Sequence, residues 1–301
     1  MGFRYGNEFI GMVASLIFGH DHCDLQQLGK CSEMPSNHLT IIPVRAPVQR
    51  STFDLHQTLA DSIQASGERL QDGDVLAVSS KYTAISEGRV VKLSDVVVSE
   101  KGAALAARYH MIPQMAELVL RESDHVLGGI HGFMLTAQHG IVQPNAGLDR
   151  SNIPSGYVVL FPKEPYKSAA DIRHAMRELL SVDIGVIVTD SWLMPGRLGT
   201  TGVALATAGF RPLQDERGKA DLFGNLMQVT VRGVADTICA AAELVMGERD
   251  EATPIAIIRN TGVKIEEVEL SAADVAIDWK QDIYIESLTS GRWLETFGGQ
   301  D

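Results

Sequence analysis

Cysteine is scarce in this sequence, since 301 residues include only three. Cys23, Cys31 and Cys239 are too few and too scattered to build a disulfide framework in a chain of this length. We therefore expect a protein of a reducing, cytoplasmic compartment.

Long apolar runs are also missing. The leader-like stretch, Phe9 to Gly19, has about half of the roughly 20 apolar residues that a membrane-spanning helix needs. His20, Asp21 and His22 follow it, where a secretory signal would have small residues and a cleavage site. The sequence thus predicts neither a membrane span nor secretion.

Positive charge is in short supply. The 26 Lys and Arg residues stand against 38 Asp and Glu, a formal net charge of -12, and no segment interleaves basic residues with aromatic ones. Binding to nucleic acid or to an anionic membrane requires Lys and Arg to neutralise phosphates, so we expect neither partner. An anionic small molecule would need a divalent cation or a local cluster of donors.

Two common nucleotide motifs are absent: no segment matches GxxxxGK[ST], and no GxGxxG follows a strand. Any nucleotide site must be built in another way. The length and the 45% hydrophobic content fit an ordinary globular protein of two domains or one large one.

From Leu39 onward, helical and strand-like patterns alternate, which predicts a mixed α and β protein. Several short β runs adjoin one another, and this argues against a purely alternating, doubly wound sheet. The expected strands are 39–44, 74–80, 125–129, 133–137, 140–142, 156–161, 184–190, 226–231 and 254–260. The expected helices are 54–66, 102–108, 113–121, 168–180 and 234–247, and residues 195–210 form a glycine-rich stretch.

Residues 1–37 lack a regular pattern, and we interpret them as an N-terminal extension. His20, His22, Cys23 and Cys31 are zinc-ligand types, yet their spacing fits neither usual pattern of paired ligands.

Two polar segments are candidates for chemistry. The loop Asn145 to Asn152 combines a carboxylate, two amides and a hydroxyl around Gly147, although a plain polar loop is the alternative. Asp190 and Ser191 end the apolar run Ile184 to Val188, and a carboxylate followed by a hydroxyl suits Mg²⁺. The alternative is that Asp190 only caps the following loop.

These segments carry a family resemblance. NAGLDRSN (145–152) and TDSWLMPGRLGTTGVALATAGF (189–210) are similar to two signatures of the coenzyme F-420-0:gamma-glutamyl ligases. The similarity also includes SKYTAISEGRVV (80–91), MAELVLRES (115–123), RGKADLFGNLMQVT (217–230), VADTICAAAELVMGE (234–248) and PIAIIRN (254–260), and it spans roughly residues 39–263.

The resemblance implies an α+β fold with mixed sheets, flanking helices and two intertwined subdomains within residues 38–264. Residues 1–37 and the tail 265–301 lie outside that domain. It also implies a homodimer.

The implied activity joins L-glutamate through its amino group to the phospholactyl carboxylate of a deazaflavin precursor, with GTP, through an acyl phosphate. The implied cations are Mg²⁺ or Mn²⁺, with K⁺ as an additional candidate. Two alternatives stay open: related chemistry with another acceptor or nucleotide, and a non-catalytic homologue that binds a deazaflavin or a nucleotide.

By position, the resemblance implies roles for a set of individual residues. Asp149 and Asp190 are the expected catalytic metal ligands, joined by Ser191 and Glu248. The expected nucleotide contacts are Ile42, Pro43, Val44, Arg45, Ser80, Lys81, Asn152 and Arg197.

Three cationic positions of the family are lost, because Ile85, Met194 and Asn225 stand in their places. Charged hydrogen bonds to phosphate are strong, so the loss of these cations indicates that the site binds anions differently. The residues that could compensate are Arg45, Arg89, Arg150 and Arg197. Trp192 either borders the substrate or packs in the core.

Overall fold

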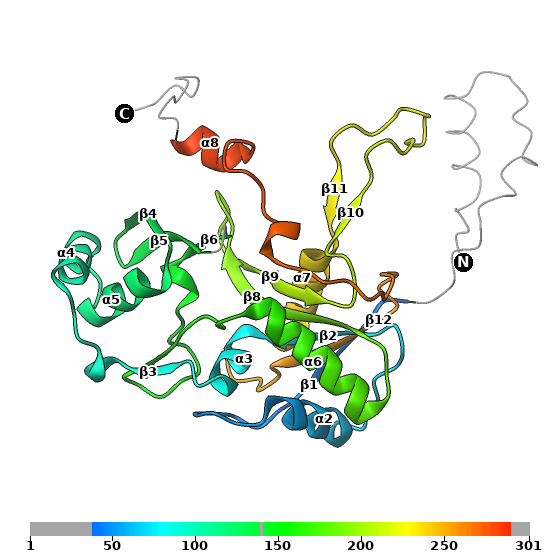
Figure 1. Ribbon diagram of the computed structural model, residues 1–301, viewed down its shortest axis with the longest axis horizontal. Coiled ribbons are helices and arrows are strands. Elements are labelled where there is room, and N and C mark those ends of the chain that lie inside the picture. The colour runs from blue at the N-terminus through cyan, green and yellow to red at the C-terminus, as the bar shows by residue number, and fades with distance from the viewer. Residues whose placement is uncertain (1–37, 139–140, 290–301) are drawn as a thin grey trace, which may run out of the picture. The chain divides into compact units, whose positions relative to one another are not determined.

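A computed structural model of the chain describes residues 38–138 and 141–289, and the described residues from Leu39 onward form one unit (Figure 1). The predictions made for residues 1–37, including those for Cys23 and Cys31, lie outside the described residues. The sequence pattern predicted a mixed α and β fold, and the structure confirms it.

A five-stranded sheet organises most of the unit. Its order is β1 (Thr40–Val44), β12 (Ile255–Arg259), β2 (Val75–Ser79), β8 (Gly185–Leu193) and β9 (Thr200–Ala208). β2 and β8 run parallel, whereas the other neighbouring pairs are antiparallel. The sheet is therefore mixed, in agreement with the argument against a doubly wound fold.

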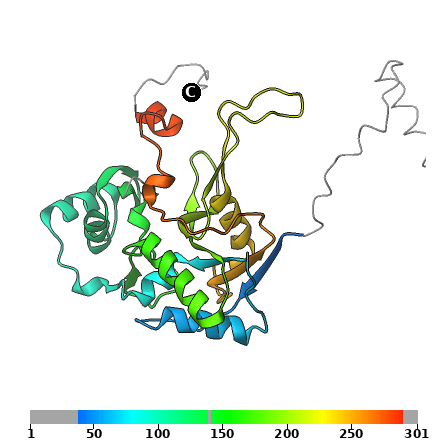
Figure 2. The same cartoon turned by 45° about the vertical axis from the view of Figure 1, so that its right-hand side comes forward.

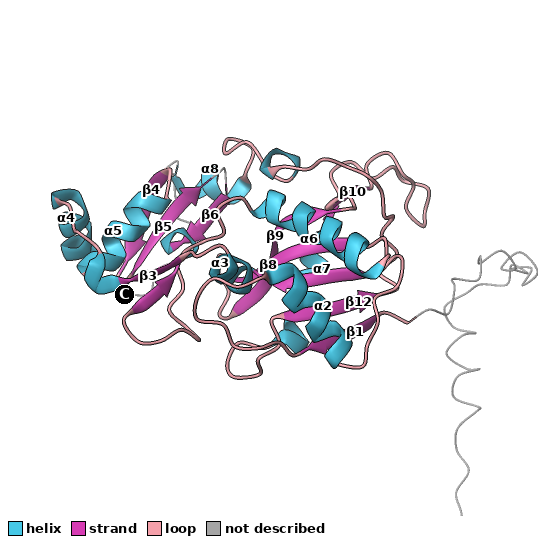
Figure 3. Ribbon diagram, turned by 60° about the horizontal axis from the view of Figure 1, so that its bottom comes forward, coloured by secondary structure: helices cyan, strands magenta, loops and turns pink. Residues whose placement is uncertain are grey.

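Successive side chains of a strand point to opposite faces of the sheet. The central strands have continuous apolar runs, so both of their faces are apolar and are buried. In β2, Leu76 and Val78 pack into one hydrophobic cluster, and Val75 and Ala77 pack into another. The first cluster lies under α2 (Leu55–Ala65) and α6 (Pro165–Leu180). The second lies under α7 (Val234–Met246), so helices cover both faces of the sheet (Figure 3).

A second group of elements is inserted between β2 and α6. It contains α4 (Glu100–Tyr109), α5 (Pro113–Glu122), the pair β3 (Val90–Lys92) and β7 (Tyr157–Val159), and the sheet β4 (His125–Ile130), β5 (Phe133–Gln138) and β6 (Ile141–Pro144). It has its own hydrophobic clusters, around Met134 and Leu118. The chain thus leaves the large sheet after β2 and returns to it at β8, and the two intertwined subdomains that the resemblance implies stay a prediction.

The remaining elements are short. α3 (Ser80–Ser86) follows β2 directly, the hairpin β10 (Leu213–Asp215) and β11 (Val231–Gly233) precedes α7, and α8 (Ile283–Thr289) is the last described helix (Figure 2). Single 3-10 turns occupy Leu93–Asp95, Asn145–Gly147 and Ala272–Asp274. Among the described residues, no helix combines the length and the hydrophobicity that a bilayer-spanning segment requires.

One sequence prediction of secondary structure was wrong. The predicted strand over 226–231 is mostly irregular, and Leu226 forms only an isolated bridge with Ala220. The glycine-rich stretch, in contrast, contains the nine-residue strand β9. A Cβ at Gly202 would lie 2.5 Å from the carbonyl oxygen of Cys239, so glycine there allows α7 to pack closely against β9.

Candidate active site

A cavity of about 640 Å³ opens beside the ends of the two parallel strands. Ser79, the last residue of β2, pairs with Thr189 of β8, and both line the cavity. Five chain segments contribute its walls: 46–50, 79–85, 149–154, 189–191 and 243–254. A site beside the carboxyl ends of parallel strands is where ligands usually bind in such sheets.

Asp190 lies on β8 just beyond its fully buried part, and the strand continues to Leu193. The pairing of β8 with β9 shifts register between Val188 and Thr189, which is the mark of a bulge. One carboxylate oxygen of Asp190 accepts a hydrogen bond from the backbone N–H of Ser191 at 2.8 Å. The Ser80 hydroxyl, in the first turn of α3, also donates to this carboxylate.

The loop before Asp149 has a backbone conformation that residues other than glycine seldom adopt. Asn145, Ala146 and Gly147 have φ values of 51°, 52° and 68°, all in the left-handed region. Two hydrogen bonds hold this turn: Met134 N–H donates to Asn145 Oδ1 at 2.9 Å, and Ala146 N–H donates to Thr136 Oγ1 at 2.9 Å. The loop is therefore fixed to β5.

Asp149 is held by both its backbone and its side chain. Its N–H and C=O exchange hydrogen bonds with Val159 at 3.0 and 2.9 Å. Its carboxylate accepts from the Ser151 N–H at 2.6 Å and from the Ser151 hydroxyl at 3.0 Å. The ammonium of Lys81 lies 2.5 Å from Asp149 Oδ2 and 2.6 Å from Ser151 Oγ, so this ion pair connects α3 to the loop.

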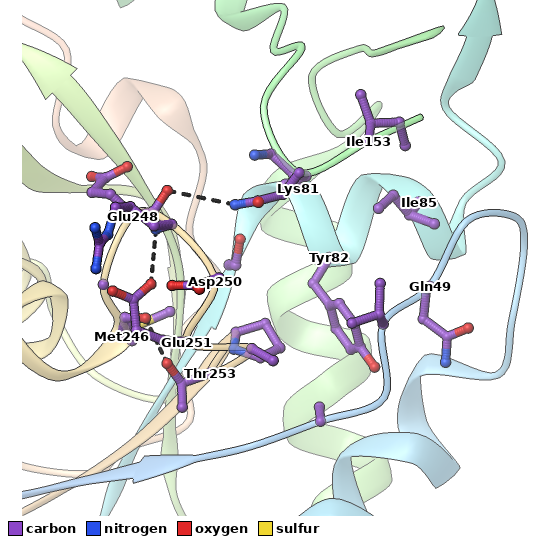
Figure 4. Close-up of a pocket in the computed structure, with 18 of the residues that line it drawn as sticks. Gln49, Lys81, Tyr82, Ile85, Ile153, Met246, Glu248, Asp250, Glu251 and Thr253 are labelled. Carbon is purple, nitrogen blue, oxygen red and sulfur yellow. Dashed lines mark hydrogen bonds between the residues drawn. The ribbon is translucent and has the colours of Figure 1, made fainter. Parts of the chain in front are cut away.

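The segment between α7 and β12 forms the acidic wall of the cavity (Figure 4). Thr253 Oγ1 donates to the carbonyl oxygen of Met246 at 2.5 Å and fixes the turn. Asn152, which also has a left-handed φ of 51°, reaches the carbonyl oxygen of Glu248 with its amide at 3.5 Å. The two loops that contribute polar residues are thus in contact.

Negative charge accumulates around this cavity. Burial, reinforced by the charge of Asp149, raises the pKa of Asp190 to about 6 against hydrogen bonds from Ser191 and Ser80. Burial and a hydrogen bond with Glu248 raise the pKa of Glu243. Glu243 Oε1 is buried without a hydrogen-bond partner among the described residues. Such an arrangement is one that a bound cation would stabilise.

The residue types fit a hard divalent cation, because Mg²⁺ and Mn²⁺ favour carboxylate and hydroxyl oxygens. The charges of these carboxylates act on one another, that of Asp149 on Asp190 and those of Glu248 and Asp190 on Glu243. Within residues 38–138 and 141–289, no group of three or more His, Cys, Asp or Glu side chains is placed to hold a metal ion. The metal assignment of these residues therefore stays a prediction.

Six of the twelve site residues predicted from the sequence line this cavity, and a seventh contacts one of them. Those that line it are Lys81, Asp149, Asn152, Asp190, Ser191 and Glu248, with Ser80 hydrogen-bonded to Asp190 behind the wall. Ile42, Pro43 and Val44 belong to β1, and with Arg45 they lie outside the lining, which begins at Ala46. Arg197 lies on an exposed turn outside the lining. The nucleotide contacts expected of these five residues stay predictions.

The three lost cationic positions differ in their surroundings. Ile85 is buried and lines the cavity, whereas Met194 and Asn225 do not. Arg89, a candidate for compensation, is engaged elsewhere, by Glu122 and by the Phe161 carbonyl oxygen at 3.0 Å. Trp192 packs against the main hydrophobic cluster and is absent from the cavity lining, which favours the core alternative.

Sequence reasoning missed Arg50, Tyr82, Glu243 and Arg249, which also line the cavity. Tyr82 and Glu243 lie in helices whose patterns indicate packing alone. Arg50 and Arg249 lie in loops of ordinary composition, where no local signal separates them from solvated charge.

The chain is similar in sequence to known proteins over most of its length. The family model described as F420-0:Gamma-glutamyl ligase matches residues 43–260. A coenzyme F420:L-glutamate ligase of Methanopyrus kandleri is 36% identical over 237 residues, covering 78% of this chain and 92% of the relative. The enzyme of the same name from Methanothermobacter thermautotrophicus is 34% identical, covering 71% and 85%. That of Haloarcula marismortui is 39% identical over 197 residues, covering 64% and 77%.

Proposed function

The chain belongs to the F420-0:gamma-glutamyl ligase family, and from this premise we propose that it joins the amino group of L-glutamate to the phospholactyl carboxylate of a deazaflavin precursor. The proposal includes GTP and a divalent cation, Mg²⁺ or Mn²⁺, with K⁺ as an additional candidate. It makes the protein a ligase of coenzyme F420 biosynthesis.

One observation carries the proposal: Lys81, Asp149, Asn152 and Asp190, which come from three distant segments, face a single cavity. Two of them are carboxylates in a chain of net charge -12. Holding acidic groups together in an acidic protein is unfavourable unless a cation binds there.

The chemistry explains why a triphosphate is needed. A carboxylate does not react with an amine unaided, so an oxygen of the precursor carboxylate first attacks the terminal phosphorus of GTP. The bond to GDP breaks, and an acyl phosphate forms. The glutamate nitrogen then attacks the acyl carbon, phosphate leaves, and the nitrogen loses a proton to give the amide.

The residues have separable roles in this scheme. Asp149 and Asp190 would hold the cation, with Ser191 and Glu248 as further oxygen donors. A bound divalent cation supplies charge neutralisation for the phosphates. Lys81 and Asn152 orient the phosphate chain by donating hydrogen bonds.

An apolar wall faces the acidic one. Tyr82, Ile85 and Ile153 lie across the cavity from Glu248 (Figure 4). Tyr82 is buried, and its hydroxyl donates to the carbonyl oxygen of Pro47 at 3.0 Å, so the ring is fixed. This wall suits a planar ring, and it would also shield an acyl phosphate from water.

Ile85 gives a specific reason to keep a second candidate. An apolar side chain at this lining position, where the family has a cation, suits the same ligation chemistry with a different nucleotide or acceptor.

The family resemblance also supports a homodimer, and the scarcity of cysteine supports a cytoplasmic location. Sedimentation of the purified protein would measure its oligomeric state, and fractionation of cells would show its location.

A ligation assay tests the activity. The purified chain would be incubated with the deazaflavin precursor, a panel of other carboxylate acceptors, L-glutamate and either GTP or ATP, with and without Mn²⁺. We expect a product heavier by one glutamyl residue, with release of GDP and phosphate, only when GTP and Mn²⁺ are present. Product from another acceptor or from ATP alone would favour the second candidate, and no product at all would contradict both.

A further inference from the structure

The charges that line the cavity are unevenly balanced. The acidic side chains are Asp149, Asp190, Glu243, Glu248, Asp250 and Glu251. The basic side chains are Arg50, Lys81 and Arg249. An anionic co-substrate that enters this cavity meets repulsion from the first set, so its binding depends on how the three cations are used.

Lys81 is already engaged by Asp149 and Ser151. Among the described residues, neither Arg50 nor Arg249 forms an ion pair within 4 Å. Both residues are exposed, and the backbone N–H of Arg249, rather than its guanidinium, donates to Glu251 at 2.8 Å. Their guanidinium groups therefore have donors available for a ligand.

The sheet places these two arginines at the same edge. β1 and β12 are antiparallel, and Val44, the last residue of β1, pairs with Ile255, the first residue of β12. Arg50 lies six positions after Val44, and Arg249 lies six positions before Ile255. A hydrogen bond of 3.1 Å from Ala46 N–H to the Ala252 carbonyl oxygen joins the two loops at their base.

Beyond that base the loops diverge around the cavity. Gln49, next to Arg50, lies beside Tyr82, whereas Glu248, next to Arg249, lies on the acidic wall opposite (Figure 4). The loop that carries Arg50 and the loop that carries Arg249 thus contribute to opposite walls of one cavity.

We propose that Arg50 and Arg249 bind the phosphate chain of the nucleoside triphosphate from the two sides of the cavity. This inference rests on the proposed function and adds two residues that determine how the anion is held. A planar guanidinium donates two parallel hydrogen bonds to phosphate oxygens, which suits a ligand with several such oxygens. Position 85 offers no charge, so these loops supply positive charge for the phosphates in addition to Lys81.

Calorimetric titration of the full-length protein in the presence of Mn²⁺ tests the inference, with GTP, inorganic tripolyphosphate, guanosine and L-glutamate as separate ligands. Arg50→Ala and Arg249→Ala should each weaken GTP and tripolyphosphate binding by about tenfold, because a charged hydrogen bond at an exposed site is worth about that much. Guanosine and L-glutamate affinities should stay unchanged. Arg50→Lys and Arg249→Lys should lose less, since they keep the charge but not the paired donors.

Arg108→Ala is the matched control, because Arg108 is exposed on α4 and lies outside the cavity. Circular dichroism and melting curves would show that each variant is folded. Variants that bind GTP as tightly as the unmodified protein would overturn this inference and leave the proposed function standing. Variants that bind L-glutamate more weakly while GTP affinity is unchanged would also overturn it. An unmodified protein that binds neither GTP nor tripolyphosphate would overturn both proposals.

Discussion

Lys81 places its ammonium nitrogen 2.5 Å from the Oδ2 atom of Asp149, and the same nitrogen contacts the Ser151 carbonyl oxygen at 3.0 Å. An ion pair thus occupies the place where the resemblance expects a metal-bound carboxylate. The ammonium and a divalent cation would compete for one carboxylate unless nucleotide phosphates draw the lysine away.

This relationship leads to a prediction for Lys81→Met. Without the ammonium, Asp149 is free, so Mn²⁺ should bind about tenfold more tightly in the absence of nucleotide. GTP should bind more weakly by a similar factor, because one phosphate donor is lost. Titrations with Mn²⁺ alone and with GTP at saturating Mn²⁺ would measure both affinities. Lys81→Arg keeps the charge and serves as the control. If the Mn²⁺ and GTP affinities of Lys81→Met both rose or both fell, the idea that Lys81 and the metal compete for Asp149 would be wrong.

Asp149→Asn and Asp190→Asn test the metal assignment directly. Each exchange is nearly isosteric, so the fold should persist while Mn²⁺ affinity and ligation are lost. Asp215→Asn is a matched control, since Asp215 pairs with Arg217 on the β10–β11 hairpin, away from the cavity. Mn²⁺ affinity that is unchanged in both cavity variants would remove these residues from the metal site.

Gly147→Ala should destabilise the fold by about 3 kcal/mol. The new Cβ would lie 2.4 Å from the Phe161 ring, and φ is +68°. Gly156→Ala is the control because its φ is +85° but nothing lies within 4 Å of the added atom, so we expect a loss of about 1 kcal/mol. Urea unfolding of both variants gives the difference. Equal losses would show that the loop moves to accept the methyl group.

Glu117 should make the free energy of unfolding depend on pH in the acidic range. Its buried carboxylate accepts from the Ser99 hydroxyl at 2.6 Å, from the Ser99 N–H at 3.0 Å and from Arg121 at 2.8 Å. Hydrogen bonds from Ser99 hold the pKa of Glu117 below its ordinary value of 4.5. A carboxyl whose pKa is lower in the folded state stabilises the protein above its unfolded pKa, and this contribution disappears as the pH falls through the folded value.

Glu117→Gln should therefore lower the unfolding free energy by about 2 kcal/mol at pH 7, and by progressively less as the pH falls below 4.5. Urea unfolding of both proteins between pH 7 and pH 3 would measure this. Glu100→Gln is an exposed control on α4. A difference that is the same at every pH would mean that the carboxylate charge contributes nothing.

The sequence by itself determined the types and places of most elements, because their periodicity and turn residues are local. The helix over 113–121 and the strand over 254–260 were predicted within a few residues of Pro113–Glu122 and Ile255–Arg259. Local motifs also selected Asp149 and Asp190, whose carboxylates follow a sharp turn and a buried strand.

Tertiary structure decided what no local pattern encodes. β9 forms although its segment is rich in glycine, and Gly202 in this strand lets α7 approach the sheet closely. α3 forms directly after β2 and brings Lys81 to Asp149, a contact between segments that are far apart in the sequence. The pairing of β1 with β12 brings the loops of Arg50 and Arg249 to one cavity. Local propensity acts over a few neighbouring residues, whereas a site depends on which strands become neighbours, and only the packing of the whole sheet settles that.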